Sequence, residues 1–250
     1  GKMSVAFDFT GKKILVTGAS QGIGRALAVS LCRCGAEVYA MARNSEALAQ
    51  LQREAGAKLH PIAGDVTASV DQLSSLLAPH QPFDGLVNNA GIACLESAET
   101  VTAAAIDSTF AVNFRGPVLL SQIVAREMKK ARRGGAIVNV SSQASLVPLK
   151  DHLAYCSSKS ALDMATRCLA QEFGPQGIRV NAVNPTVVLT DMGRANWSDP
   201  AKAATLLDSM PIKRFAEEED VVKSVLFLLS DASAMTTGHA LPIEGGFTTC

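Results

Sequence analysis

Short runs of apolar, often β-branched residues alternate along the chain with longer segments in which apolar residues recur at helical spacing. Such short runs, bounded by turn-forming residues, are typical of strands in a parallel sheet that helices cover on both faces. The runs predict strands at residues 14–17, 37–42, 59–63, 85–88, 136–141, 179–183 and 240–243. Helical spacing predicts helices in segments that include 24–34, 101–130, 153–173 and 218–229.

The alternation of strands and helices predicts an α/β fold. Helical connections between successive strands make those strands parallel, so the runs fit one sheet. We therefore expect a Rossmann-type, doubly wound, parallel seven-stranded sheet with helices on both faces. No repeat or linker divides residues 1–250, which are expected to form a single catalytic domain. Residues 186–215, richer in polar residues, Pro and Met, follow a strand at the edge where ligands bind, and this segment is predicted to be a substrate lid.

Composition narrows the class of partner. With 250 residues, 48% hydrophobic and 18% charged, the chain can bury a large core, which excludes a disordered or fibrous protein. Lys plus Arg equals Asp plus Glu at 23 each, so no overall charge favours nucleic acid or an anionic membrane. No apolar run approaches the ~20 residues of a membrane span, and residues 1–10 lack the order of a signal peptide. We expect a cytoplasmic protein whose partner is a small molecule.

The six cysteines form no metal or disulfide pattern. They stand at positions 32, 34, 94, 156, 168 and 250, without C-x2-C spacing or attendant histidines. Because a core of this size needs no disulfide, we expect reduced thiols and no metal site. Cys250, at the terminus, is expected to be the most exposed.

A glycine-rich turn joins the first predicted strand to the first predicted helix. It reads G-x-x-x-G-x-G within residues 17–24. Glycines allow the backbone to turn tightly and approach a pyrophosphate, which the free N–H groups of a helix N-terminus attract. The motif alone is also compatible with an ordinary turn, but its place between strand and helix favours a dinucleotide. The expected contacts are Gly18, Ser20, Gln21, Gly22, Ile23 and Gly24.

The end of the second predicted strand indicates which dinucleotide is bound. An acidic residue there would hold a ribose 2'-hydroxyl, whereas a 2'-phosphate needs a cation. The strand ends Met41-Ala42-Arg43-Asn44, with an arginine and no acid. NADP(H) is therefore favoured over NAD(H), with Arg43 carrying the preference largely alone because Gln21 supplies no second cation. The alternative is that Arg43 is a solvated surface residue.

Polar turns follow the third and fourth predicted strands at the same edge of the sheet. Asp65 can accept a hydrogen bond from an adenine amino group, and the Asn88-Asn89 turn can hold strands apart for a cofactor. By themselves these are ordinary turn residues. The expected cofactor contacts here are Asp65, Val66, Asn89, Ala90 and Gly91.

Ser142, Tyr155 and Lys159 form a candidate catalytic group. On a helix, Tyr155 and Lys159 share a face at i and i+4. A tyrosine with a pKa near ~10 needs a shift of ~3 units, or ~4 kcal/mol, to exchange protons near neutrality, and one cation at ~4 Å supplies about that. Ser142, after the fifth predicted strand, can position the substrate oxygen. Asn113, a poor helix former within a helical segment, is either a solvated polar residue or the anchor of a water that relays protons to Lys159.

Taken in their order along the chain, these motifs resemble those of the short-chain dehydrogenases/reductases. The resemblance extends over essentially the whole chain. The resemblance rests on residues 17–24, 88–91, Asn113, Ser142, Tyr155 and Lys159. It implies an Asn-Ser-Tyr-Lys tetrad, hydride transfer from nicotinamide C4, and Lys159 and Tyr155 in contact with the cofactor, together with Pro185, Val188 and Thr190. The chain departs from the family in having Pro185-Thr186 where Pro-Gly is common, which would stiffen the loop leading to Thr190.

Further segments resemble those members of the family that reduce L-xylulose and α-dicarbonyls with NADPH as homotetramers. They are residues 137–143, 152 with 155–157, 179–190, 197–200 and 242–247. The resemblance implies a substrate pocket lined by Ser142, Gln143, His152, Tyr155 and Trp197. Assembly also fits the apolar residues expected on more than one face of two helices, which are Val118, Leu119, Ile123, Leu162 and Met164.

Two alternatives stay open. The same scaffold and tetrad serve reductases of 3-ketoacyl thioesters or steroids, which differ in substrate length. A cofactor-binding protein without turnover would keep the fold, although the intact tetrad argues against it.

Overall fold

The computed structural model describes residues 7–190, 193, 197 and 199–249. Its centre is one sheet of seven strands in the order β3-β2-β1-β4-β5-β6-β7, and every neighbouring pair is parallel. The strands are β1 Lys13–Thr17, β2 Glu37–Ala42, β3 Leu59–Ala63, β4 Gly85–Asn88, β5 Gly135–Val140, β6 Ile178–Pro185 and β7 Ala240–Ile243. The predicted doubly wound sheet is confirmed, with small differences at the ends of β1, β5 and β6.

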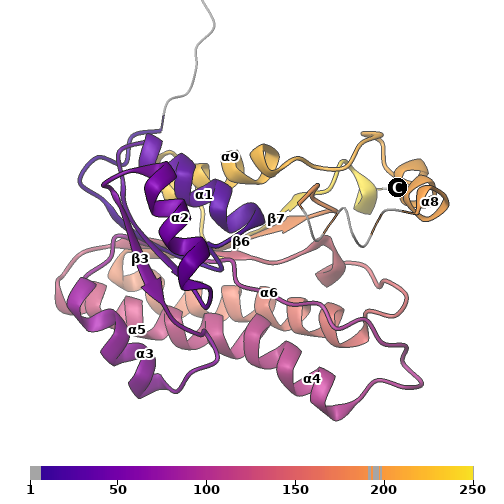
Figure 1. The fold of residues 1–250 in the computed structure, drawn as a ribbon, viewed down its shortest axis with the longest axis horizontal. Helices are drawn as coiled ribbons and strands as arrows, with labels where there is room; N and C mark the ends of the chain where they lie inside the picture. The colour runs from indigo at the N-terminus through magenta and orange to yellow at the C-terminus, as the bar shows by residue number, and fades with distance from the viewer. Residues whose placement is uncertain (1–6, 191–192, 194–196, 198, 250) are drawn as a thin grey trace, which may run out of the picture.

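Helices cover both faces of the sheet (Figure 1). On one face lie α1 Gly22–Arg33, α2 Ser45–Ala55 and α9 Glu218–Leu229, and on the other lie α3 Val70–Leu77, α5 Gly116–Lys130 and α6 Leu153–Phe173, with α4 Ala103–Phe110 against α6. The predicted helix at 101–130 is α4 and α5 joined by a π-helical turn, η2 Ala111–Arg115. Sequence spacing did not single out α2 and α3, which begin at side-chain caps from Asn44 and Ser69.

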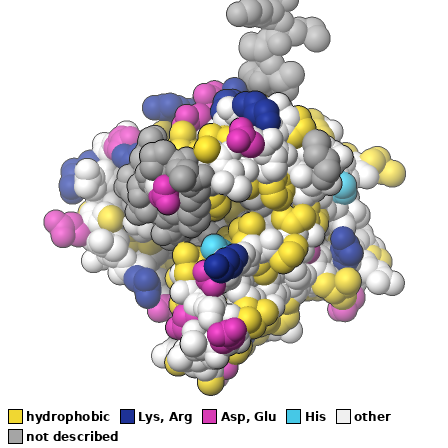
Figure 2. All heavy atoms as spheres, turned by 90° about the vertical axis from the view of Figure 1, so that its right-hand side faces the viewer, with side chains coloured by type: hydrophobic (Ala, Val, Ile, Leu, Met, Phe, Trp, Pro, Cys, Tyr) yellow, Lys and Arg dark blue, Asp and Glu magenta, His cyan; other side chains and the backbone are white. Residues whose placement is uncertain are grey.

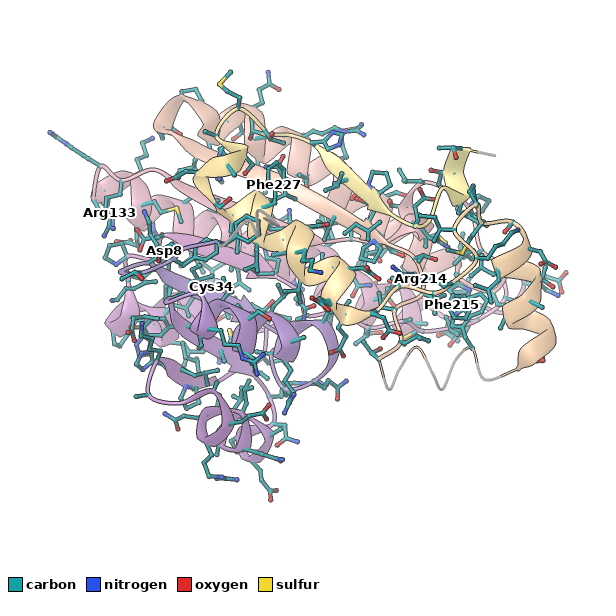
Figure 3. All side chains as sticks on the ribbon, turned by 90° about the horizontal axis from the view of Figure 1, so that it is seen from above. Asp8, Cys34, Arg133, Arg214, Phe215 and Phe227 are labelled. Carbon is teal, nitrogen blue, oxygen red and sulfur yellow. The ribbon has the colours of Figure 1, made fainter. Side chains whose placement is uncertain are left out.

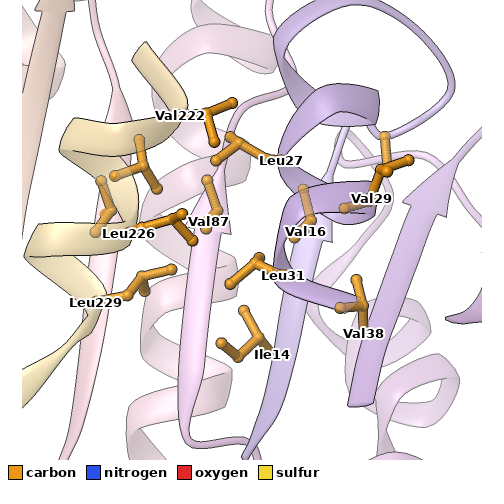
Figure 4. Packing of buried hydrophobic residues seen from close by; sticks show 14 of the residues in the cluster. Ile14, Val16, Leu27, Val29, Leu31, Val38, Val87, Val222, Leu226 and Leu229 are labelled. Atoms are coloured by element: carbon orange, nitrogen blue, oxygen red, sulfur yellow. The ribbon is translucent and has the colours of Figure 1, made fainter. Parts of the chain in front are cut away.

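The core consists of two apolar layers, one on each side of the sheet. In the first, side chains of α1 and α9 meet over the central strands, as Leu27, Leu31, Val222 and Leu226 show (Figure 4). In the second, α3 and α5 pack against the opposite face of the same strands. Strands β1, β2 and β4 are almost wholly buried and contain unbroken apolar runs, which is why the sequence revealed them so clearly, whereas the edge strands β3 and β7 are partly exposed.

Helices α5 and α6 present less free apolar surface than the sequence indicated. Ile123 and Leu162 are 2% and 1% exposed, so the expectation that they lie on a second face is wrong. Leu119 also packs against the core, whereas Met164 is 54% exposed. The core takes these side chains because α5 and α6 lie against both the sheet and each other.

The strand order places a crevice at the carboxyl edge of the sheet. The chain runs from β1 outward through β2 to β3, then returns to β4 on the other side of β1. The loops after β1 and β4 therefore diverge, and ligands of open α/β sheets bind at such a point. Within the described part of the chain, no helix is both long and apolar enough to cross a membrane.

Candidate active site

A cavity of about 710 Å³ lies at the carboxyl edge of the sheet and brings together nearly all of the predicted site residues. Figure 2 looks onto the end of the molecule where α4 and α8 (Pro200–Asp208) lie, and hydrophobic side chains gather over the middle of that face. The predicted residues that line the cavity are Gly18, Ser20, Gln21, Gly22, Ile23, Arg43, Asp65, Val66, Asn89, Ala90, Gly91, Ser142, Gln143, His152, Tyr155, Lys159, Pro185, Val188, Thr190 and Trp197. Gly24 and Asn113 are not among the residues that line the cavity.

The glycine turn between β1 and α1 is packed too closely for side chains. Gly18 has φ +63°, and a Cβ there would lie 2.8 Å from the Cα of Ala90. A Cβ on Gly24 would lie 2.4 Å from the Gly18 carbonyl oxygen, so Gly24 serves packing within the turn. Asn89 Nδ2 donates to the carbonyl oxygens of Thr17 and Gly18 at 3.0 and 3.2 Å, which fixes the loop after β4 to the same turn.

The first turn of α1 leaves its N–H groups available to the cavity. Gln21 at the N-cap makes no side-chain hydrogen bond to the helix, and the first turn carries no acidic residue. A helix N-terminus of this kind attracts anions through its free N–H groups and its dipole. The bare glycine turn and the uncapped helix therefore fit the pyrophosphate of a dinucleotide.

Arg43 lies beyond the end of β2 with its side chain exposed at the cavity. Asn44 caps α2 by accepting a hydrogen bond from Ala47 N at 3.0 Å. Among the described residues Arg43 makes no ion pair, so its charge is available to a ligand. The site has no carboxylate at the end of β2, as the sequence predicted.

Asp65 is held by its own loop, since its Oδ1 accepts from the N–H and the hydroxyl of Thr67 at 2.9 and 2.8 Å. Arg115 Nη2 donates to the carbonyl oxygen of Thr67 at 3.3 Å, and both residues line the cavity. Sequence reasoning missed Thr67 and Arg115. The fold alone brings η2 beside the loop after β3, so no local signal marked them.

Tyr155 and Lys159 lie on successive turns of α6 beside the loop that carries Ser142. Lys159 Nζ lies 5.8 Å from the centre of the Tyr155 ring and donates to the carbonyl oxygen of Val140 at 2.8 Å. The hydroxyl of Ser142 is hydrogen-bonded to Tyr155 and accepts from Ala144 N at 3.1 Å. The predicted arrangement on one helix face is present.

Burial dominates the protonation of both groups. It raises the pKa of Tyr155 above its ordinary value, and the hydrogen bond with Ser142 opposes this only in part. Burial lowers the pKa of Lys159 to about 8, against the opposing effect of the Asp163 carboxylate. The expected lowering of the tyrosine pKa by Lys159 is not found in this structure, because desolvation penalises the phenolate more than Ser142 stabilises it and Lys159 makes no resolved contribution.

Asn113 is fully buried in the π-helical turn and is not a solvated residue. Its amide accepts from Ile92 N and donates to Ile92 O, both at 2.9 Å, and also donates to Ser158 Oγ at 3.1 Å. These bonds fix the strand-like segment after Gly91 to α6. Both donors of the side chain are therefore engaged, which leaves only its oxygen to contact a water.

Orphaned polar atoms mark the substrate end of the cavity. Gln143 is 2% exposed and its Oε1 has no partner, and Thr186 is 7% exposed with an unpartnered Oγ1. His152 Nδ1 lies 2.5 Å from the Lys150 carbonyl oxygen. Because a carbonyl only accepts, Nδ1 carries the proton in this contact, and Nε2 is available as an acceptor.

The segment predicted to be a lid includes α8, and contacts join its two ends. Residues 191–192, 194–196 and 198 of this segment lie outside the described residues. Val188 pairs with Ala216, and the Trp197 and Phe215 rings meet edge to face at 6.0 Å between their centres. Phe215 and its neighbour Arg214 lie between α8 and α9 (Figure 3).

Pro185-Thr186 ends β6 at the mouth of the cavity. Thr186 N donates to Ile243 O at 2.9 Å, which ties this turn to β7. Because a glycine at 186 could form the same backbone bond, the stiffening of the loop stays a prediction. Thr190, four residues on, lies against the glycine turn, because a Cβ on Gly22 would lie 3.1 Å from its Cγ2.

The described cysteines are 32, 34, 94, 156 and 168, and all are free thiols. Cys250, expected to be the most exposed, lies outside the described residues. Across residues 7–190, 193, 197 and 199–249, no cluster of three or more His, Cys, Asp or Glu side chains is placed to hold a metal ion.

Comparison with known proteins agrees with this geometry. A family model for short chain dehydrogenases matches residues 12–201. A Caenorhabditis elegans protein named L-xylulose reductase is 56% identical, with 98% of this chain and 99% of that protein covered. A Gallus gallus protein named D-erythrulose reductase is 52% identical, with the same coverage of 98% and 99%. The crystal structure of a short-chain type dehydrogenase/reductase from Mycobacterium marinum has a TM-score of 0.91 and 31% identity, and 98% of each chain is covered.

Proposed function

The chain belongs to the short chain dehydrogenase family, and on that premise we propose that it is an NADPH-dependent reductase of small polar ketones. One observation carries the proposal: a single cavity joins Ser142, Tyr155 and Lys159 to the bare glycine turn and Arg43. When bound, the nicotinamide cofactor supplies the hydride. The chain's own residues must then bind both partners, align them and supply the proton.

Arg43 supports NADP(H) over NAD(H). A guanidinium holds a phosphate through charge-assisted hydrogen bonds, and the end of β2 offers no carboxylate to a 2'-hydroxyl. We propose that the cofactor is held by Gly18, Ser20, Gln21, Gly22, Ile23, Gly24, Arg43, Asp65, Val66, Asn89, Ala90, Gly91, Tyr155, Lys159, Pro185, Val188 and Thr190, with Gly24 acting through the shape of the turn.

Tyr155 is the proposed proton donor. Its raised pKa keeps the phenol protonated at neutral pH, as an acid must be before it acts. Ser142, already hydrogen-bonded to that hydroxyl, would share the substrate oxygen with it. As the phenol loses its proton, the Lys159 cation stabilises the negative charge. Asn113 completes the proposed tetrad by fixing the segment beside Lys159. The remaining lone pair of its amide oxygen would bind the water that relays protons.

The polar lining supports a small hydroxylated substrate, of which L-xylulose, reduced to xylitol, is the preferred one. Ser142, Gln143, His152, Tyr155 and Trp197 would contact it. Gln143 Oε1 would otherwise stay unpaired, and an unpaired buried polar atom costs roughly 1–3 kcal/mol. The partly exposed His152 offers a further acceptor at Nε2. A long acyl chain or a steroid would leave those atoms unpaired.

A panel of ketones assayed with NADPH and with NADH tests this function. The panel contains L-xylulose, diacetyl, an acetoacetyl thioester and a 3-ketosteroid. We expect the highest kcat/KM for L-xylulose and diacetyl, with NADPH. Faster reduction of the thioester or steroid would favour those alternatives, and no NADPH consumption with any ketone would make this a non-catalytic cofactor-binding protein.

We further propose that the enzyme is cytoplasmic and homotetrameric. Free thiols at every described cysteine suit a reducing compartment. Exposed apolar side chains on α4 and α6, namely Ile106, Leu153 and Met164, are candidates for contact between subunits.

A further inference from the structure

Asp163 is a buried carboxyl group on α6 that the reaction described above does not use. It lies one helical turn beyond Lys159 and two beyond Tyr155, so the three side chains follow one line of the helix. Asp163 is 6% exposed, and a carboxyl group is rarely buried so deeply unless it is paired.

The carboxylate of Asp163 has one strong hydrogen bond. Its Oδ2 accepts from Asn184 Nδ2 at 2.7 Å, whereas its Oδ1 has no hydrogen-bond partner. One neutral amide does not compensate a buried negative charge, because an ion in a low-dielectric interior needs an opposite charge as well. Lys159 lies on the adjacent turn of the helix, and the Asp163 carboxylate acts on its ammonium group electrostatically.

Asn184 connects Asp163 to the loop that holds the catalytic serine. The same Nδ2 lies 3.2 Å from the Ser142 carbonyl oxygen and 2.7 Å from Ser145 Oγ. Ser145 in turn donates to the Ser142 carbonyl at 2.7 Å. The amide faces this way because its nitrogen, and not its oxygen, can pair with a carboxylate.

Other charges near α6 do not replace Asp163. The elements packed against α6 are α4, η2, α5, β6 and the short helices at 143–145 and 174–176. Asp107 on α4 and Arg115 on η2 are exposed, and Arg179 on β6 donates to carbonyl groups at the C-terminal end of α9. The remaining titratable groups of these elements and of α6 are Arg126, Glu127, Lys129, Lys130, Tyr155, Cys156, Arg167, Cys168 and Glu172. Of all these groups, Asp163 is the charge that acts on Lys159.

We propose that Asp163 is a positioning residue of the reductase site, which holds Asn184 against the Ser142 loop and supplies the counter-charge to the Lys159 ammonium. The inference rests on the proposed function and extends the tetrad by one residue that touches neither substrate nor cofactor. The sign of its effect follows from charge. The carboxylate opposes the lowering of the Lys159 pKa by burial, so its removal takes that pKa below about 8.

Asp163→Asn tests the charge while keeping the shape and an acceptor oxygen. We expect the basic limb of kcat/KM for L-xylulose reduction to move to lower pH by on the order of 1 pH unit, because Lys159 loses its proton earlier. Turnover near pH 6 should stay close to that of the wild type. Asp107→Asn, an exposed carboxyl on the neighbouring helix, is the matched control and should leave the limb in place.

A second readout needs no turnover. In the cofactor-free wild type, the pKa of Lys159 is about 8 in the folded state and near ~10.4 in the unfolded chain. Between these pH values the unfolded chain binds the proton more than the folded state does, so the free energy of unfolding rises with pH. In Asp163→Asn this rise should begin at lower pH. If the wild type reduces no ketone, the proposed function fails, whereas these unfolding profiles still test Asp163.

Asp163→Glu separates charge from shape. It keeps the carboxylate, so the basic limb should stay near its wild-type position even if the free energy of unfolding falls. A limb that moves equally in the Asn and Glu variants, or in neither, overturns the proposal. If Asp163→Asn does not fold, Asp163→Ser takes its place under the same comparison.

Discussion

The proposed reduction depends on one phenol, that of Tyr155. Tyr155→Phe removes a single oxygen and keeps the ring, so folding and NADPH binding should persist while reduction falls by at least about 100-fold, typical of losing a general acid. Lys159→Met should differ, because it removes a cation and a proposed hydrogen-bond donor to the cofactor ribose. NADPH affinity and turnover should then fall together.

The measurements are NADPH binding by fluorescence and steady-state reduction of L-xylulose for each variant. Near-normal turnover in Tyr155→Phe would mean that another residue or a water protonates the substrate. Loss of NADPH binding in Tyr155→Phe would instead point to a structural role for the hydroxyl.

Arg43 should decide the cofactor preference. Arg43→Asp replaces attraction to a 2'-phosphate by repulsion, so NADPH affinity should fall by about 10–100-fold, the range of a charged hydrogen bond, while NADH affinity holds or rises. Arg115→Ala is the control, since Arg115 lines the same cavity but lies beside the loop after β3. The ratio of NADPH to NADH affinity should be unchanged in that variant. Equal losses of both cofactors in Arg43→Asp would make Arg43 structural.

Sequence spacing placed Tyr155 and Lys159 of the proposed tetrad on one helix face, but it did not predict the surroundings of the tetrad residues. Tyr155 and Lys159 stand four residues apart on one helix, so their shared face follows from helix geometry. The bonds of Asn113 to Ile92 and Ser158 join residues 21 and 45 positions apart. The link between Asp163 and Asn184 spans 21 positions, between a helix and a strand. Only the folded chain brings such partners together, which is also why the direction of the tyrosine pKa shift was unexpected.

At the scale of elements, strands were easier to predict than helices. A strand such as β2, buried on both faces, has an unbroken apolar run with sharp ends. Helix α2 is more polar and helix α3 has only 8 residues, and sequence spacing did not single them out. The π-helical turn at η2 keeps helical spacing, so a single helix from 101 to 130 was the natural expectation. It carries Asn113, and π-turns occur frequently at functional sites.

The β1–α1 turn gives a prediction in which strain and contact can be separated. Gly18→Ala places a Cβ 2.8 Å from the Cα of Ala90 at φ +63°, so it should lower both thermal stability and NADPH affinity. Gly11→Ala is the matched control, because Gly11 has φ +76° and nothing within 4 Å of its Cβ position. It should cost only the roughly 1–2 kcal/mol of a left-handed residue, with NADPH binding intact. Equal effects of the two substitutions would show that the close approach in the turn is unimportant.

At the scale of the whole molecule, strand order places the site. The return from β3 to β4 across β1 separates two loops and leaves the crevice in which Arg43, Gly18 and Ser142 line one cavity. The alternation of apolar runs and helical segments predicted a doubly wound parallel sheet, but not the order of its strands. The bridge between Val188 and Ala216, near the two ends of the predicted lid, had no such signal, since a bridge between two loops depends on tertiary contacts.

The tetramer is the prediction that concerns the surface of the whole molecule. Met164 on α6 is 54% exposed and Ile106 on α4 is 37% exposed, although both are apolar. Assembly into isologous dimers, paired again into a tetramer, would remove such side chains from water and gain about 25 cal/mol for each Å² covered. Light scattering at micromolar concentration should therefore give four times the chain mass. Met164→Glu places a charge on that face and should lower the mass, whereas Gln50→Glu, which adds the same charge on exposed α2, should not. A monomeric wild type would contradict the tetramer. A tetramer that persists in Met164→Glu would mean that the contact between subunits lies elsewhere.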